Sequence, residues 1–235
     1  MPLPLISSVN APEVVLGAGF TGAQDALLRV ALTTVSTLEP GRTWSELSPA
    51  QQVALRIIDT LRGAHGRGII WKGRPSWLDA KVLTDLREGA ERAKPAAEWF
   101  PGGFHRFAGA RDVAQALEAS VGVSTFVRAL VGREIGEMAA NFMYYEAAGN
   151  CAYPHIDAAD FALNALCLLR HESSAKPSSS LWFYPVDAEP FELTLAMGEL
   201  AIFHGRAIVH GRTPVAADER VHVLSIGFTW PSTQT

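Results

Sequence analysis

Two patterns of hydrophobic positions divide the chain near residue 136. Before that point, apolar residues recur every three to four positions, which is the spacing of a helix with one buried face. After it, short stretches rich in β-branched and aromatic residues alternate with turn-forming residues, as is typical of strands. We therefore expect a mainly helical part over residues 1–135 and a β-rich core over residues 136–235, with helices at 21–37, 48–62, 77–93 and 112–131.

The β-rich part leaves no helical segments for the crossovers that parallel strands require. The pattern predicts an antiparallel sandwich with the helical part packed against it, which is an α+β fold with a mainly β core. The polar stretch from Glu172 to Ser180 is short enough to connect two strands, and the sequence shows neither an internal repeat nor a clear linker. We therefore expect a single domain over residues 1–235.

The composition of the chain is that of an ordinary globular protein, with 48% hydrophobic and 19% charged residues. A formal net charge of −4 argues against a nucleic-acid partner, which usually needs a basic face. We find no signal peptide and no apolar run long enough to cross a bilayer. The two cysteines, Cys151 and Cys167, form no CxxC motif. These features predict a cytoplasmic protein with no membrane partner, and they leave its oligomeric state open.

The segment VVLGAGFTG, residues 14–22, contains the G-x-G-x-x-G pattern of dinucleotide-binding folds. That pattern binds a pyrophosphate only inside a strand–helix–strand unit, and no second buried strand follows before Pro40. Thr21 and Gln24 have the spacing of a capping box, in which each residue caps the start of a helix. We favour a turn and a helix cap here, with a nucleotide- or flavin-binding oxidoreductase as the less favoured alternative.

Two histidines and an aspartate have the residue types and spacing of a metal site. His155 and Asp157 are two residues apart, so their side chains share one face if the segment is extended. A histidine from a distant strand, such as His210, would complete three ligands on one side of an ion. Two histidines and one carboxylate leave three positions open, which is diagnostic of non-haem Fe(II) oxygenases. We predict that these three residues bind a metal ion.

In these residues the chain resembles the Fe(II)- and 2-oxoglutarate-dependent dioxygenases, whose core is a double-stranded β-helix, or jelly roll. Family members carry His-x-Asp, then a distal histidine, then an arginine about ten residues later. His155, Asp157 and His210 match the first elements, and Arg220 follows His210 by ten residues. The resemblance covers residues 124–230 well, and the helical first half is similar only in outline.

The tripeptide His-Gly-Arg occurs twice, beginning at His204 and at His210. His210 has the family's spacing to Arg220, and it follows Gly198-Glu199-Leu200 at the distance seen in many members. We therefore assign the distal ligand to His210 and leave a structural or supporting role for His204.

The resemblance implies that the protein uses Fe(II), 2-oxoglutarate and O2. It implies that Arg220 binds the far carboxylate of 2-oxoglutarate and that Tyr145 contacts this cosubstrate. His222 stands where some subfamilies place a serine, which leaves the detailed contacts of that carboxylate open. The implied reaction is hydroxylation coupled to decarboxylation of 2-oxoglutarate to succinate. The presence of Asp157 argues against halogenation, since halogenating relatives have Gly or Ala at this position.

We expect the substrate to be a small molecule, such as an amino acid or a biosynthetic intermediate. Trp182 and Tyr184 share one face of a predicted strand, and either a substrate contact or a place in the core fits them. Asn164 is polar within an apolar stretch, so it either faces a ligand or makes a structural hydrogen bond. Arg212 fits a substrate carboxylate or a salt bridge at the rim. The main alternative for the whole chain is a jelly-roll binding protein without catalytic activity.

Overall fold

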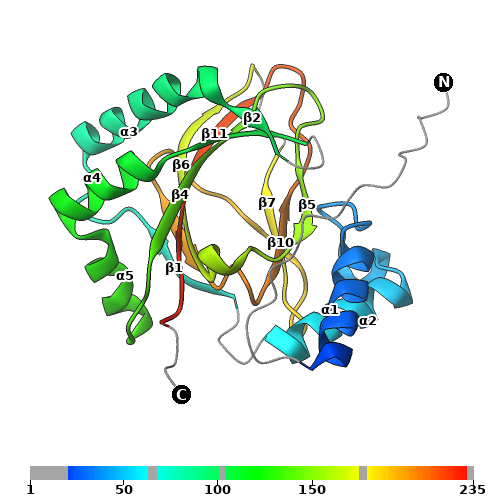
Figure 1. Ribbon diagram of the computed structural model, residues 1–235. Helices are drawn as coiled ribbons and strands as arrows, with labels where there is room; N and C mark the ends of the chain where they lie inside the picture. The colour runs from blue at the N-terminus through cyan, green and yellow to red at the C-terminus, as the bar shows by residue number, and fades with distance from the viewer. Residues whose placement is uncertain (1–20, 63–67, 101–103, 175–178, 232–235) are drawn as a thin grey trace.

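Two antiparallel sheets form the centre of the computed structural model, which describes residues 21–62, 68–100, 104–174 and 179–231 (Figure 1). The strands are β1 (Ile69–Gly73), β2 (Glu98–Trp99), β3 (Arg106–Gly109), β4 (Met138–Tyr145), β5 (Ala152–His155), β6 (Leu163–Glu172), β7 (Leu181–Tyr184), β8 (Phe191–Leu193), β9 (Leu200–Phe203), β10 (Val209–Arg212) and β11 (Arg220–Phe228). The larger sheet has the order β1-β9-β6-β11-β4-β3-β2, and the smaller has the order β5-β10-β7-β8. From β4 onwards the chain passes repeatedly between the two sheets, which is the topology of a jelly roll.

The helices follow the predicted stretches closely. They are α1 (Gly22–Val35), α2 (Pro49–Arg62), α3 (Ala80–Ala93), α4 (Arg111–Val121) and α5 (Val123–Val131). The predicted helix over residues 112–131 is in fact two helices, because Gly122 adopts a left-handed conformation (φ 63°) that ends α4. The predicted capping box is confirmed, since Thr21 and Gln24 exchange hydrogen bonds at the start of α1.

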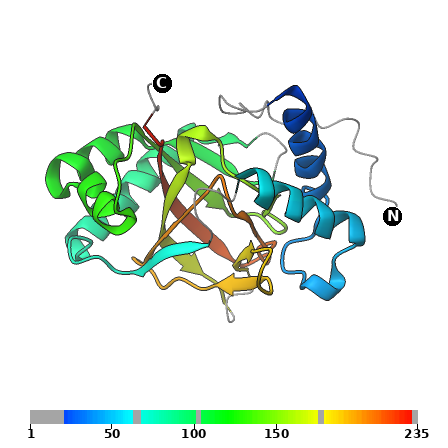
Figure 2. The same ribbon diagram turned by 90° about the horizontal axis from the view of Figure 1, so that it is seen from below.

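Helices cover both outer faces of the sandwich (Figures 1 and 2). Helices α3, α4 and α5 pack on the larger sheet through one apolar cluster. Helices α1 and α2 pack on the smaller sheet through a second cluster, which includes Tyr184 and Val209. A third cluster fills the space between the sheets and includes Leu166, Phe183 and Phe203. The predicted fold class, a mainly β jelly roll with helices packed against it, is confirmed.

The first 135 residues contribute more than helices to this fold. Strands β1, β2 and β3 lie there and join the larger sheet at its two ends. They are short, β1 and β3 are only partly buried and β2 is exposed, so they carry little of the alternation that marks a strand in a sequence. The division into a helical half and a β half was therefore too simple.

The alternation of side chains along β11 decides which of its residues face the interior. Val221 and Val223 belong to the cluster between the sheets. Leu224 belongs to the cluster under the outer helices, and His222 lies 3.5 Å from Glu91 of α3. Odd-numbered residues of this strand therefore point into the jelly roll, and even-numbered residues point outwards.

The strand pairing excludes the dinucleotide-binding alternative for the described part of the chain. Every pair of neighbouring strands there is antiparallel, whereas a strand–helix–strand unit for a dinucleotide requires parallel strands. Gly17 and Gly19 of the glycine-rich segment lie outside the described residues. Across residues 21–62, 68–100, 104–174 and 179–231, no helix is long and apolar enough to cross a membrane.

Gly227 on β11 is expected to be needed for stability. A Cβ atom at this position would overlap Phe161 and the carbonyl oxygen of Asp160, which belong to the turn before β6. Overpacking of this kind costs about 1–3 kcal/mol. We expect Gly227→Ala to lower the free energy of unfolding by that amount in urea denaturation. Gly109→Ala on β3, where an added Cβ meets nothing within 4 Å, serves as the control and should change it little.

Candidate metal centre

The two predicted histidine ligands lie opposite each other on neighbouring strands. His155 ends β5 and pairs with His210 of β10 in the antiparallel ladder. The register shifts between His210 and Arg212, so three residues of β5 span two residues of β10. The two imidazole rings lie 4.6 Å apart between centroids. Strand pairing therefore brings together two side chains that are far apart in the sequence.

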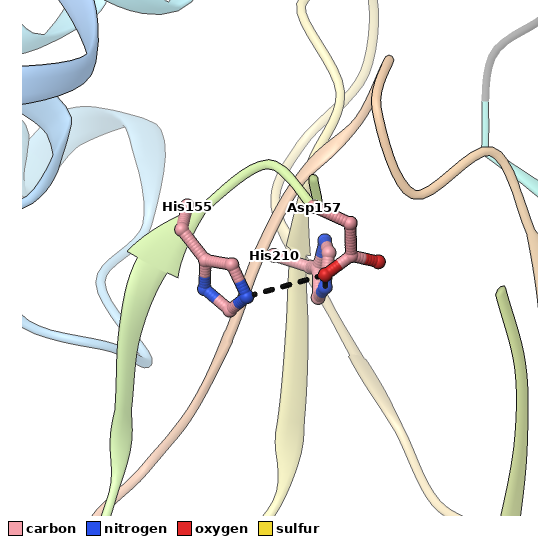
Figure 3. A group of neighbouring side chains, drawn as sticks. All are labelled: His155, Asp157 and His210. Atoms are coloured by element: carbon pink, nitrogen blue, oxygen red, sulfur yellow. Dashed lines mark ion pairs between the residues drawn. The ribbon is translucent and has the colours of Figure 1, made fainter. Parts of the chain in front are cut away.

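Asp157 completes the cluster from the loop that follows β5 (Figure 3). Its backbone N–H donates to the carbonyl oxygen of Gly205 (2.8 Å), which fixes this loop against the turn before β10. The Nε2 atoms of His155 and His210 each lie 3.5 Å from Oδ1 of Asp157. One ligand atom from each residue lies within 4.8 Å of the others, and no other such group occurs among the described residues.

The second nitrogen of each histidine fixes the orientation of its ring. His155 Nδ1 lies 2.7 Å from the carbonyl oxygen of Tyr153, and His210 Nδ1 lies 3.0 Å from that of Ile208. Because a carbonyl oxygen only accepts, each Nδ1 must carry the hydrogen and donate it. Nε2 of each ring is then the nitrogen that lies towards Asp157, which is how a metal-binding histidine presents its ligand atom.

The electrostatics of the cluster favour an ionised carboxylate. Burial raises the pKa of Asp157, but the two neighbouring histidines outweigh it and hold this pKa well below its usual range. Burial lowers the pKa of His155, yet its contact with Asp157 gives a net upward shift. Two imidazole nitrogens and one carboxylate oxygen thus converge on a common point. This donor set fits a divalent transition metal such as iron.

Asn164 and Ser225 hold the carboxylate of Asp157 from behind. Asn164 Nδ2 donates to Asp157 Oδ2 (2.9 Å), and Ser225 Oγ donates to Asn164 Oδ1 (2.8 Å). The carboxylate therefore uses Oδ2 for this support and turns Oδ1 towards the histidines. The sequence allowed Asn164 either to face a bound ligand or to make a structural hydrogen bond. The structure shows the hydrogen bond, and its acceptor is the candidate metal ligand Asp157.

Tyr145 and Arg212 also lie inside the jelly roll. Tyr145 ends β4 and belongs to the cluster between the sheets. Arg212 pairs with Leu181 of that cluster and shares its strand face with His210. The guanidinium carbon of Arg212 lies 5.4 Å from the centre of the Tyr145 ring. Both residues therefore lie inside the jelly roll, and Arg212 is two residues from His210 on the same strand.

The structure does not bring Arg220 to this group. As an even-numbered residue of β11, its side chain points away from the interior, on the same face as His222. Its guanidinium donates to the carbonyl oxygens of Ala217 (3.1 Å) and Glu219 (2.7 Å). The ten-residue spacing from His210 to Arg220 matches the family pattern. A spacing alone does not establish which face of the strand Arg220 occupies.

Trp182 and Tyr184 likewise lie on the outer face of their strand. Both pack in the cluster beneath α1 and α2, and the Tyr184 hydroxyl accepts a hydrogen bond from the backbone of Gly41 (2.8 Å). The residue between them, Phe183, faces the interior and stacks against His210 at 5.7 Å between ring centroids. Of the two alternatives that the sequence left open for Trp182 and Tyr184, the structure shows a place in the core for both. The sequence did not single out Phe183, because both faces of β7 carry aromatic residues.

Two further histidines clarify the arrangement. His204 lies 6.0 Å from Trp230 between ring centroids and is not part of the cluster, in agreement with the assignment of the distal ligand to His210.

His105 was not singled out from the sequence. It is buried, it stacks on Tyr145 at 4.9 Å, and burial lowers its pKa to about 4, so it is neutral. No motif marks it, since β3 is too short to be recognised.

Comparisons with known proteins show which fold this is. No protein-family model matches the chain, and no curated protein sequence matches it. Among solved structures, a prolyl-4-hydroxylase from Pseudomonas putida is 14% identical with a TM-score of 0.54, covering 76% of this chain and 99% of its own. The non-haem α-ketoglutarate-dependent epimerase SnoN of nogalamycin biosynthesis is 15% identical with a TM-score of 0.53, covering 78% and 84%. A prolyl hydroxylase from Trichoplax adhaerens is 14% identical with a TM-score of 0.53, covering 78% and 94%. The chain therefore has the fold of the Fe(II)- and 2-oxoglutarate-dependent oxygenases.

Removal of Asn164 tests whether it orients Asp157. Loss of such a supporting partner typically weakens metal affinity about 10- to 100-fold. We expect Asn164→Ala to bind Fe(II) less tightly by this factor in anaerobic calorimetric titration. Ser225→Ala removes only the outer hydrogen bond and should have a smaller effect. Equal affinities for Asn164→Ala and the unaltered protein would show that Asp157 is held without this contact.

Proposed function

We propose that this protein is an Fe(II)- and 2-oxoglutarate-dependent dioxygenase that hydroxylates a small molecule. The observation that carries the proposal is the cluster of His155, Asp157 and His210, in which both histidines present Nε2 towards one carboxylate oxygen. Its position on two strands of a jelly roll supports the same conclusion. Two histidines and one carboxylate leave three adjacent positions on an ion for other ligands.

The chain's own residues would hold and shield the metal. His155, Asp157 and His210 would bind iron, and the Asn164–Ser225 pair would keep the carboxylate oriented. When bound, iron would use 2-oxoglutarate and O2 for the oxidation of the substrate, with succinate and CO2 as the products of 2-oxoglutarate. The protein contributes position and exclusion of water, while the metal contributes the difficult chemistry.

The exposure of the ligands indicates how a substrate would approach. The side chain of His155 is 44% exposed, whereas that of His210 is 5% exposed. A substrate would therefore reach the metal from the side of His155, and the apolar interior beside His210 would hold the cosubstrate. Of the solved structures with this fold, SnoN binds nogalamycin RO together with Fe3+ and α-ketoglutarate, and the Trichoplax enzyme binds a peptide fragment. We propose an amino acid or a biosynthetic intermediate as the substrate here.

Replacing the candidate ligands tests this function. We expect Asp157→Ala and His210→Ala to lower succinate formation from 2-oxoglutarate by at least about 1,000-fold, because removing a metal ligand removes most of the catalytic centre. His204→Ala, which alters the neighbouring His-Gly-Arg, is the matched control and should retain activity. Succinate formation and O2 uptake are measured together, with far-ultraviolet circular dichroism to confirm folding.

The same assay separates the enzyme from a jelly-roll binding protein. A binding protein would bind a metal ion or a small molecule but would form no succinate under any condition. Normal succinate formation by Asp157→Ala would refute the ligand assignment itself.

A further inference from the structure

Aromatic side chains extend the inner face of the larger sheet beyond β4. Strand β5, which carries His155, is the edge strand of the smaller sheet, whereas β4 of the larger sheet is followed by β3 and β2. Phe107 of β3 pairs with Met143, which packs against the cluster between the sheets. Phe107 therefore lies on the inner face. Phe100, directly after β2, contacts it with 5.8 Å between ring centroids.

The hairpin of β2 and β3 is attached to β5 through Phe104. The backbone N–H of Cys151, directly before β5, donates to the carbonyl oxygen of Phe104 (2.9 Å). The Phe104 ring lies 4.4 Å from the ring of Tyr153 on β5. We call Phe100, Phe104, Phe107 and Tyr153 the aromatic rim. Phe100 is 40% exposed and Tyr153 is 37% exposed, so the rim presents ring surface to solvent.

The aromatic rim is continuous with the candidate metal centre. The carbonyl oxygen of Tyr153 is the acceptor that orients the His155 ring (2.7 Å). Stacked rings lead inwards from the rim, since Phe100 stacks on His105 at 4.9 Å and His105 stacks on Tyr145 at 4.9 Å. His155 is also the more exposed of the two histidines in the metal cluster. A molecule that approaches the metal from the side of His155 therefore lies beside the aromatic rim.

The area of the aromatic rim fits a small molecule better than a protein partner. An aromatic side chain has about 150–250 Å² of surface to bury. No member of the rim is more than 40% exposed, so its four side chains offer well under the roughly 800 Å² that each partner contributes to a standard protein–protein interface. Aromatic side chains bind flat rings through offset stacking or edge contacts. The rim therefore suits a single flat ring system.

The charges around the aromatic rim disfavour an anion. Glu98 of β2 pairs with Phe107, which places it on the inner face beside the rim. Burial raises the pKa of Tyr153, and the nearby carboxylate of Glu39 adds to this shift. Arg106 of β3 lies on the opposite face from Phe107 and donates to two backbone carbonyl oxygens there. The rim therefore has acidic groups beside it, while the cation of its hairpin points away.

We propose that the aromatic rim binds an aromatic ring of the substrate and that this ring carries no negative charge. This narrows the proposed substrate to a biosynthetic intermediate with an aromatic ring. The inference rests on the proposed function, because it takes the molecule oxidised at the metal to be the molecule that the rim binds. Phe100 and Tyr153 are then residues that determine specificity by touching the substrate.

The test compares two alcohols that differ only in aromaticity. Protein loaded with Fe(II) and 2-oxoglutarate is titrated calorimetrically without oxygen, either with 2-naphthol or with its saturated analogue decahydro-2-naphthol. The two share one carbon skeleton and one hydroxyl, so a preference for 2-naphthol reports contacts to a flat aromatic ring. We expect 2-naphthol to bind about 10-fold more tightly. 2-Naphthoate, which has a carboxylate in place of the hydroxyl, should bind more weakly than 2-naphthol.

Phe100→Leu should remove most of this preference, because leucine keeps an apolar side chain but has no ring. Trp99→Leu is the matched control. Trp99 is adjacent in sequence and more exposed (55%), but it pairs with Arg106 on the opposite face of the hairpin, so the preference should persist in this variant. Tyr153→Leu should also reduce the preference, and it serves if Phe100→Leu does not fold.

The distance of the bound ring from the metal is tested by NMR spectroscopy. With Mn(II) in place of Fe(II), the signals of 2-naphthol should broaden much more than with Zn(II), because a paramagnetic ion relaxes nearby nuclei. Equal broadening with both ions would show that the ring binds away from the metal, and it would overturn the proposal.

The remaining outcomes separate the aromatic rim from the function on which it rests. If Phe100→Leu and Tyr153→Leu keep the preference, or if Trp99→Leu loses it, the ring binds elsewhere and the proposal is wrong. If the two alcohols bind equally although Fe(II) and 2-oxoglutarate are bound, the substrate class is wrong and the metal function stands. Tighter binding of 2-naphthoate would refute the absence of negative charge.

Two further results have equally clear meanings. If sedimentation shows a dimer that Phe100→Leu dissociates, the aromatic rim is an interface between two copies of the chain, and the proposal fails. If Fe(II) and 2-oxoglutarate do not bind, the proposed function fails. A preference for 2-naphthol that Phe100→Leu removes would then still assign the rim as a site for an aromatic ligand.

Discussion

The pairing of β5 with β10 is the constraint on which the candidate site depends. It sets His155 opposite His210, and the irregularity in β5 turns His155 inwards at the point where the strand ends. The backbone then leads directly into the loop that carries Asp157. Each histidine is oriented by the carbonyl oxygen of the residue two positions earlier in the chain. The geometry of the ligands therefore depends on the backbone of β5 and β10.

Close approach of the backbone holds the loop with Asp157 in place. Gly205 lies so close to the Asp157 carboxylate and the carbonyl oxygen of Phe161 that an added Cβ atom would overlap both. Gly227 of β11 likewise leaves no room for a Cβ atom beside the ring of Phe161. A side chain at either position would push the loop outwards. Asn164 then connects the loop to β11 through Ser225. Two glycines and two polar side chains thus fix one carboxylate, in an interior that is otherwise mostly apolar.

The sequence predicted features that depend on residue type and periodicity. The helices and the antiparallel sandwich follow from such patterns, whereas the jelly roll and the choice of His210 as the third residue beside His155 and Asp157 were implied by the family resemblance. It did not predict which face of a strand a residue occupies, because a shift of one residue exchanges the two faces. Apolar and aromatic residues lie on both faces of β7 and β11, since each strand is covered on one side by helices and on the other by the second sheet. For that reason the sequence singled out Trp182 and Tyr184 on β7 and not Phe183, which is the residue of this strand that faces the interior.

The polar side chains within the jelly roll form two groups. Oδ1 of Asp157 lies 3.5 Å from Nε2 of both His155 and His210. Arg212 and the fully buried Glu219 are joined through the hydroxyl of Ser179, which accepts from Arg212 (3.0 Å) and donates to Glu219 Oε1 (2.6 Å). An unpaired charge costs most in a region of low dielectric constant, so each of these buried acids lies beside basic side chains. The Asp157 carboxylate is thus kept ionised by the two histidines that share its site, and the Arg212–Ser179–Glu219 contacts stabilise a second polar group within the same apolar interior.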